Sequence, residues 1–409
     1  MATSIVPKDR EQLSAGTARI LDASRAIAAF AVLLQHARSA LLVDPKSATR
    51  SNVATTILYW ASGFGHQAVV IFFVLSGALV GGSVLRSVSS EEWSWRAYLI
   101  RRLSRLYIVL IPALLLILLW DGLGAAIFPA HGIYGDVMSA ITLGGHTLIV
   151  HNRGAMAYAG NIAFLMTIYV PVLGSGAALW SLSNEFWYYI LFPCMVLAVA
   201  RRCNSWRSLA YVVLTFAIIL FVSRGIVEWM SVWLLGIAAV RAPRFRLSSI
   251  RGSWLVIAAF MVFAVTTALE RTIMNVISLR GDLAVGVGFA LLLYCALCRD
   301  SSEPVAVGTL RLSGTWKRFA GFSYTLYLFH QPPLAFANAW LSYTHHSRWQ
   351  PTAPHVATMF GVIAAIVLYS YFGSRVTEAH TDDLRSALAY RYAGRRHVRS
   401  EPTYDPYSA

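Results

Sequence analysis

Arg25 and His36 lie eleven positions apart in the apolar run LDASRAIAAFAVLLQHAR. Eleven residues of α-helix advance about 16 Å in about three turns, so the two side chains project from nearly the same face. Because such residues are costly inside an apolar span, they tend to face a polar cavity, and the pair predicts a site that extends into a membrane. The alternative is an ordinary ion pair between Arg25 and Asp22, with His36 at the far end of the helix. These residues alone leave both interpretations open.

Two further apolar runs carry residues suited to chemistry. Arg102 and Arg105 share a helix face in YLIRRLSRLYIVLIP, where a basic cluster either holds phosphate groups or only sets the orientation of the span. Glu185 lies in the first two turns of ALWSLSNEFWYYILFP, and a half-buried carboxylate there is a functional candidate unless a structural ion pair explains it. Both segments therefore add candidates for the same membrane site.

His330 lies in SYTLYLFHQPPL, directly before a glutamine and two prolines. The prolines predict a kink or break of this helix. His330 is then either part of the wall of a cavity or a core histidine whose hydrogen bonds are satisfied.

Motifs for other classes of enzyme are missing from the sequence. It contains no phosphate-binding loop, dinucleotide fingerprint, HExxH pair or nucleophile-elbow serine. Cys295 and Cys298 form a CxxC pair without a second pair or a histidine partner, so we interpret them as small packing residues. We therefore expect no metal and no chemistry driven by nucleotide, zinc or serine.

Composition places the chain in the membrane class. Of the 409 residues, 57% are hydrophobic and only 13% are charged, which is too apolar for a soluble globule of this length. The first nineteen residues are polar and lack the apolar core of a signal peptide, so the first span is expected to remain in the protein.

The distribution of charge explains the net charge of +15 without nucleic acid. Threaded with a cytoplasmic N-terminus, ten apolar stretches leave most lysines and arginines on the cytoplasmic side, as the positive-inside rule requires. We therefore predict an all-α polytopic helical bundle of about ten spans in the bacterial inner membrane, with both termini cytoplasmic. The stretches are roughly 20–40, 66–85, 106–128, 178–198, 209–223, 226–240, 253–269, 283–298, 319–340 and 356–373.

One membrane domain is expected over residues 20–375, after a cytoplasmic segment 1–19 and before a basic cytoplasmic tail 376–409, with no soluble domain appended. Residues 161–172 are apolar, but counting them as a span would reverse the charge bias, so we predict a re-entrant or interfacial piece of an outer loop. Ser76, Gly77 and Gly81 should form a face for tight helix packing.

Five motifs in order resemble the membrane acyltransferase-3 family of bacterial carbohydrate O-acyltransferases. They are Arg25-x10-His36, FFVLSG at 72–77, Arg102-x-x-Arg105, WSLSNEFWYY at 180–189 and SYTLYLFHQP at 323–332. The resemblance covers roughly residues 20–380. It implies transfer of an acyl group, commonly acetyl from cytoplasmic acetyl-CoA, to a hydroxyl of a cell-surface or exported carbohydrate that is possibly lipid-linked.

The resemblance also implies roles for the candidate residues. His36 would be the base or a transient acyl carrier, with Glu185 and His330 completing the catalytic set. Arg102 and Arg105 would hold the phosphates of CoA, and Arg25 would line the path of its pantetheine arm. The chain departs from the family at Glu378-Ala379-His380, where many members have a basic residue and a proline after the glutamate.

The residue chemistry fits this reaction independently. A sugar hydroxyl is a poor nucleophile near neutral pH, and histidine supplies a base with a suitable pKa. The alternative is a transporter or flippase for a lipid-linked saccharide, which should show internal repeats or paired broken helices that we do not find in the sequence. The acceptor, the acyl chain length and the oligomeric state are left open.

Overall fold

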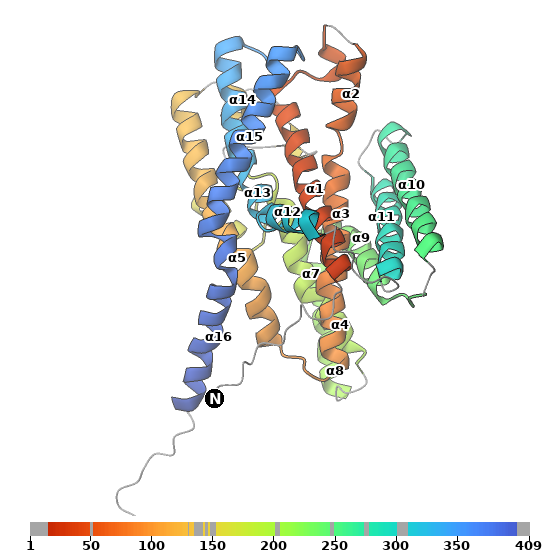
Figure 1. The fold of residues 1–409 in the computed structure, drawn as a ribbon. Helices are drawn as coiled ribbons and strands as arrows, with labels where there is room; N and C mark the ends of the chain where they lie inside the picture. Colours follow the sequence, from red (N-terminus) through yellow and green to blue (C-terminus); the bar gives the residue numbers. More distant parts are fainter. Residues whose placement is uncertain are drawn as a thin grey trace, which may run out of the picture.

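The computed structural model describes residues 15–49, 52–129, 131–134, 142–143, 146–147, 153–200, 205–245, 249–273, 278–300 and 310–398 (Figure 1). This part of the chain is helical, apart from loops and a two-residue ladder that pairs Thr142–Leu143 (β1) with His146–Thr147 (β2). The prediction of an all-α fold is confirmed. The main helices are α1 (Ala15–Leu41), α2 (Val53–Ala61), α3 (Gly65–Ser76), α4 (Gly82–Ser89), α5 (Trp95–Ile127), α6 (Ala155–Ile162), α7 (Leu179–Ala198), α8 (Ser205–Phe221), α9 (Arg224–Arg241), α10 (Ser249–Ile273), α11 (Leu279–Asp300), α12 (Leu310–Ala320), α13 (Ser323–Phe329), α14 (Gln331–His345), α15 (Ala353–Val376) and α16 (Thr381–Val398).

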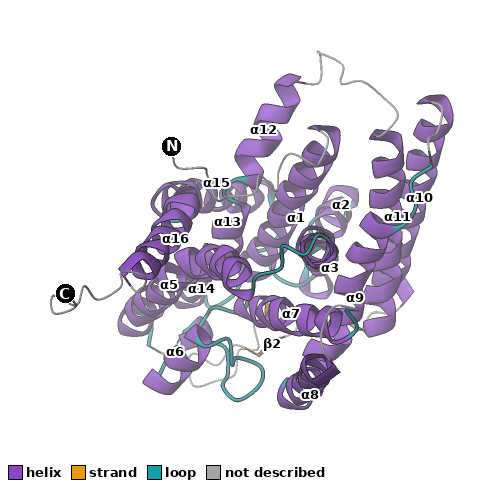
Figure 2. Cartoon of the chain, turned by 90° about the horizontal axis from the view of Figure 1, so that it is seen from below, coloured by secondary structure: helices purple, strands orange, loops and turns teal. Residues whose placement is uncertain are grey.

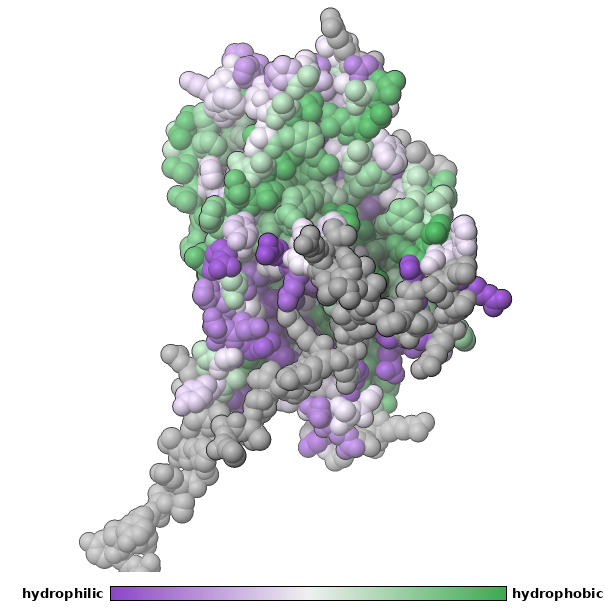
Figure 3. Space-filling model, in the orientation of Figure 1, coloured by the Kyte–Doolittle hydropathy of each residue, from purple (hydrophilic) through white to green (hydrophobic). Residues whose placement is uncertain are grey.

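Within the described residues, six helical segments are long and apolar enough to cross a membrane, and the bent pair α8–α9 would make a seventh. On the face shown in Figure 3, hydrophobic residues form a broad band below a polar cap at the outer ends of α2, α14 and α15. The protein is therefore a multi-pass membrane protein. The six or seven segments are fewer than the ten predicted from apolar stretches.

Helices α3 and α9 pack through small residues, as the sequence predicted. A Cβ atom on Gly77 would lie 1.8 Å from the carbonyl oxygen of Trp233, and one on Gly236 would lie 1.9 Å from that of Val74. A π-helical turn, Gly77–Gly81, joins α3 to α4. Because only glycine permits this approach, the helix that carries the FFVLSG motif is fixed against α9.

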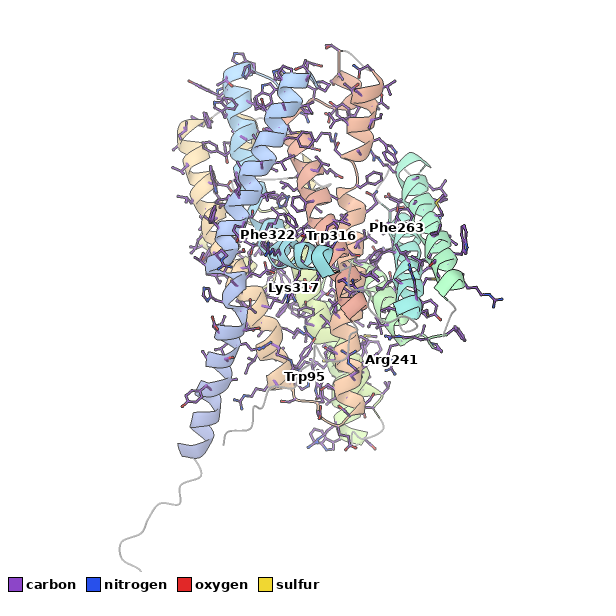
Figure 4. All side chains as sticks on the ribbon, in the orientation of Figure 1. Trp95, Arg241, Phe263, Trp316, Lys317 and Phe322 are labelled. Carbon is purple, nitrogen blue, oxygen red and sulfur yellow. The ribbon has the colours of Figure 1, made fainter. Side chains whose placement is uncertain are left out.

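The apolar stretch 319–340 does not form one continuous helix. It contains the end of α12, all of α13 and most of α14, with a break at His330 between the last two. Pro332 and Pro333 lack N–H donors and are accommodated in the first turn of a new helix, which explains the break. Helix α12, with Trp316 and Lys317 on it, runs across the direction of α1 and α15 (Figure 4).

The segment 161–172 forms no spanning helix. Only its first two residues belong to α6, and the rest turns back through Phe164 and Thr167, which both have positive φ. Phe164 and Met166 are fully buried, and their carbonyl oxygens accept hydrogen bonds from Ser183 of α7 at 2.9 and 3.0 Å. This geometry is what a re-entrant piece requires, since its free backbone groups are satisfied by the protein.

Three further helices, α10, α11 and α16, flank the helices described above. Helices α10 and α11 pack against each other and lie beside α9 and α3 (Figure 2). In the predicted basic tail, α16 packs along α5. Residues 1–14 and 399–409 of the predicted terminal segments lie outside the described residues.

Candidate active site

A cavity of about 120 Å³ lies between α1, α3, α5, α7 and α13. Three of the arginines predicted from the sequence line it together with Glu185, and the remaining wall is mostly aromatic and aliphatic. The lining residues are Arg25, Val69, Phe72, Phe73, Leu75, Ser76, Leu79, Val80, Arg102, Arg105, Ser181, Leu182, Glu185, Tyr189, Ser323, Tyr324 and Tyr327. Each of the five sequence motifs therefore contributes at least one residue to the wall of this basic cavity.

Arg25 makes an ion pair and also lies in the wall of the cavity. Its Nη2 lies 2.6 Å from Oδ1 of Asp22, so the ordinary ion pair exists. Its side chain nevertheless lines the cavity. The ion pair holds the Arg25 guanidinium in the wall of the cavity.

Arg102 is fixed by contacts on two sides. Its Nη2 donates to Ser83 Oγ at 2.7 Å, and its guanidinium carbon lies 5.6 Å from the ring centre of Tyr98 and 5.9 Å from that of Tyr189. Cation–π contacts of this kind orient a guanidinium without neutralising it. Arg102 therefore presents a positioned positive charge to the cavity.

Glu185 is held by hydroxyl groups, not by a single ion pair. Its Oε1 accepts hydrogen bonds from Ser76 Oγ at 2.8 Å and from the hydroxyl of Tyr189. Ser76 in turn accepts from Trp233 Nε1 at 3.1 Å. The serine of the FFVLSG motif, which sequence reasoning assigned only to packing, thus fixes the carboxylate.

Arg105 faces two carboxylates, because it interacts electrostatically with both Glu378 and Glu185. Glu378 also accepts hydrogen bonds from the backbone N–H of Thr325 at 3.1 Å and from its hydroxyl at 3.0 Å. The glutamate at the departure from the family pattern therefore ties α5, α13 and the end of α15 together. No spacing in the sequence indicated this contact.

His36 and His330 are brought together by the break between α13 and α14. His36 Nδ1 lies 2.7 Å from His330 Nε2, and both rings are buried. His330 Nδ1 lies 3.0 Å from the carbonyl oxygen of Leu326, which can only accept, so Nδ1 carries the proton. In the neutral pair His330 Nε2 then accepts from His36 Nδ1–H, which leaves the lone pair of His36 on Nε2.

Gln331 fixes the same region to α7. Its Oε1 accepts from the backbone N–H of Ala178 at 2.6 Å, which orients the amide, and its Nε2 lies 3.4 Å from His36 Nδ1. Sequence reasoning missed Gln331, although it lies inside the SYTLYLFHQP motif.

The histidine pair lies next to the cavity but is not among its lining residues. Tyr327 connects the two regions, since it lines the cavity and its ring lies 6.2 Å from that of His330. Its hydroxyl is hydrogen-bonded to Ser181 Oγ at 2.8 Å, and its ring packs against Phe72 at 5.5 Å. Phe72 and Tyr327 thus form an aromatic layer in the wall of the cavity, and Tyr327 is the member of this layer that lies next to His330. The sequence did not predict this layer.

The chain is similar to one family model and, over a shorter stretch, to one individual protein. The family model described as an acyltransferase domain, that of acyltransferase family 3, matches residues 19–372. An uncharacterized protein of Haemophilus influenzae is 26% identical over 164 residues, which is 37% of this chain and 57% of the relative. The chain thus matches little more than half the length of that relative, and no solved structure matches it. With its five motifs gathered at one site and the family match covering most of its length, the chain belongs to the acyltransferase-3 family.

Proposed function

We propose that the protein transfers an acetyl group from cytoplasmic acetyl-CoA to a hydroxyl of a cell-surface or exported carbohydrate at the bacterial inner membrane. The observation that supports this proposal most is the cavity lined by Arg25, Arg102 and Arg105, which abuts the buried pair His36–His330. CoA is polyanionic at one end and carries the acyl thioester at the other. A cavity with three arginines in its wall, and with a buried histidine next to one of its lining residues, suits such a molecule.

The proposed reaction uses the lone pair on His36 Nε2. As a base, His36 takes the proton of the acceptor hydroxyl while the oxygen attacks the thioester carbonyl; the carbon–sulfur bond then breaks and the CoA thiolate leaves and is protonated. As a transient carrier, the same nitrogen attacks the thioester carbonyl, the carbon–sulfur bond breaks and the CoA thiolate leaves. The acceptor hydroxyl then attacks the acylated imidazole, the carbon–nitrogen bond breaks to free His36, and the hydroxyl proton goes to the thiolate. In both forms His330 is a positioning residue that fixes the tautomer of His36, and Glu185 orients the acceptor or the approach to His36.

The proposed function predicts ester formation that depends on both substrates. Purified protein in proteoliposomes, given acetyl-labelled acetyl-CoA inside and surface polysaccharide outside, should place label on the polysaccharide. A deletion strain should correspondingly lack O-acetyl esters on one of its surface carbohydrates. Label found only on lipid or protein would reject a carbohydrate acceptor, and carbohydrate appearing across the membrane without label would favour a transporter or flippase.

We further propose ten spans with both termini in the cytoplasm, residues 20–375 as the membrane domain and 376–409 as the tail. The charge distribution supports this topology. Cysteines introduced at Lys46, Arg153 and His346 should react with an impermeant reagent from outside, and those at Ser89 and Asn204 only after the membrane is opened. Reaction at Asn204 from outside would require another span and would contradict the ten-span topology.

A further inference from the structure

His66, Glu270 and Asp282 converge from α3, α10 and α11 at a place away from the candidate active site. One ligand atom from each residue lies within 4.8 Å of the ligand atoms of the other two. Their exposure is low, with the side chain of His66 13% exposed, Glu270 7% and Asp282 1%. Neither the motifs nor the proposed reaction uses these three residues.

The contacts inside this cluster leave one buried oxygen without a partner. His66 Nε2 lies 2.6 Å from Asp282 Oδ1, and the amide nitrogen of Gln67 donates to Glu270. The amide oxygen of Gln67 is buried and has no hydrogen-bond partner among the described residues. Since Gln67 is only 5% exposed, leaving its oxygen without a partner is unfavourable.

The charged groups at the cluster are two carboxylates, the His66 imidazole and the neighbouring guanidinium of Arg271. Arg271 follows Glu270 and interacts with it electrostatically. Its guanidinium, however, donates to the backbone oxygens of Tyr59, at 2.7 Å, and Trp60. Two nearly buried carboxylates beside one imidazole are a costly arrangement, which a bound cation would stabilise.

We propose that His66, Glu270 and Asp282 bind a divalent cation of the zinc type, with Gln67 as a fourth ligand. Rotation of the Gln67 amide by half a turn would exchange its nitrogen and oxygen and turn the unpartnered oxygen toward Glu270. A set of one imidazole nitrogen with carboxylate and amide oxygens suits zinc and similar transition metals, whereas calcium and magnesium prefer oxygen alone. This proposal differs from the expectation of no metal drawn from the sequence.

The role assigned to the ion is structural. The ligands come from three helices, so the ion would fasten the α10–α11 hairpin to the outer end of α3. The Trp229 ring lies 5.7 Å from that of His66 and 5.1 Å from that of Phe73, which lines the cavity. One aromatic layer therefore separates the ion from the cavity. The ion supports the wall of the active site and takes no part in the transfer.

Metal analysis of the untagged full-length protein tests this proposal without an activity assay. Protein purified in detergent, supplied with zinc and dialysed, should retain about one equivalent per chain. Asp282→Asn and His66→Ala should each bind zinc at least about tenfold more weakly, because each removes a ligand. His355→Ala is the matched control, since that histidine stacks on Trp349 away from the cluster and should leave the zinc content unchanged.

Thermal unfolding gives a second measurement in case a variant folds poorly. A chelator should lower the unfolding temperature of the wild type and of His355→Ala, and zinc should restore it, because a ligand that binds only the folded state stabilises that state. Asp282→Asn should show no response to either reagent. The proposal is overturned if wild-type protein retains no more zinc than Asp282→Asn, or if the chelator acts equally on both; the cluster is then a hydrogen-bonded network only.

Discussion

His36→Gln is expected to lower acyl transfer by a factor of about 10² to 10⁴ while the protein remains folded and inserted. Glutamine can take part in hydrogen bonds, so it can keep a contact with His330, which His36 Nδ1 makes at 2.7 Å. It cannot accept a proton near neutral pH or carry an acyl group as imidazole does. The measurement is the rate of ester formation on the acceptor at saturating acetyl-CoA, with wild-type protein in parallel.

Substitutions of His330 separate positioning from packing. His330→Gln keeps a carbonyl that can accept from His36 Nδ1–H and should retain more activity than His330→Leu, which has no acceptor. A merely structural role would predict the opposite order, because leucine suits a buried site better. His355→Gln serves as a control for the loss of an imidazole.

A His36→Gln protein with near wild-type transfer would contradict the assignment of His36 and direct attention to His330 and Glu185.

Arg102→Ala is expected to weaken the binding of acetyl-CoA about tenfold to a hundredfold, because a charge-assisted contact to phosphate contributes about 1.5–3 kcal/mol. Arg102→Lys should recover part of this affinity, since the charge is kept although the planar geometry is lost. Calorimetry or equilibrium dialysis of the purified protein measures the dissociation constant directly. The turnover at saturating donor should change much less than the affinity.

Arg207→Ala is the matched control for Arg102, because Arg207 lies on α8 outside the cavity. Arg105→Ala is a poorer test, since it also removes a cation that interacts with both Glu378 and Glu185 and should destabilise the fold. Unchanged affinity of the Arg102→Ala protein for acetyl-CoA would mean that this arginine only orients the span.

The helices were largely predictable from the sequence, because an apolar run long enough to span a membrane has few alternatives to a helix. The stretch around 319–340 shows the limit of that argument. Two prolines indicated a break, but only the packing of α12, α13 and α14 against α1 decides where each short helix lies. A hydropathy value is an average over many residues, so it does not show such a break, and residues 319–340 resemble one span.

The three arginines of the candidate site were also predictable, whereas the long-range contacts that join its parts were not. Arg25, Arg102 and Arg105 share one cavity as the motifs suggested. The contacts of Glu378 with Thr325 and of His36 with His330 join residues far apart in the chain. Such pairs depend on tertiary packing, and no local pattern in a single sequence encodes them.

The aromatic layer of Phe72 and Tyr327 bears on the proton gradient across the membrane. If the cavity opens toward the cytoplasm, as the proposed topology implies, a continuous polar path from it to the other side of the membrane would let protons leak. Tyr327, hydrogen-bonded to Ser181 at 2.8 Å, would then be part of the wall that blocks such a path while no substrate is bound. In the proposed reaction, the pantetheine arm of the donor would have to displace this layer. The arm would itself fill the gap, so that the acyl group could pass without a leak of ions.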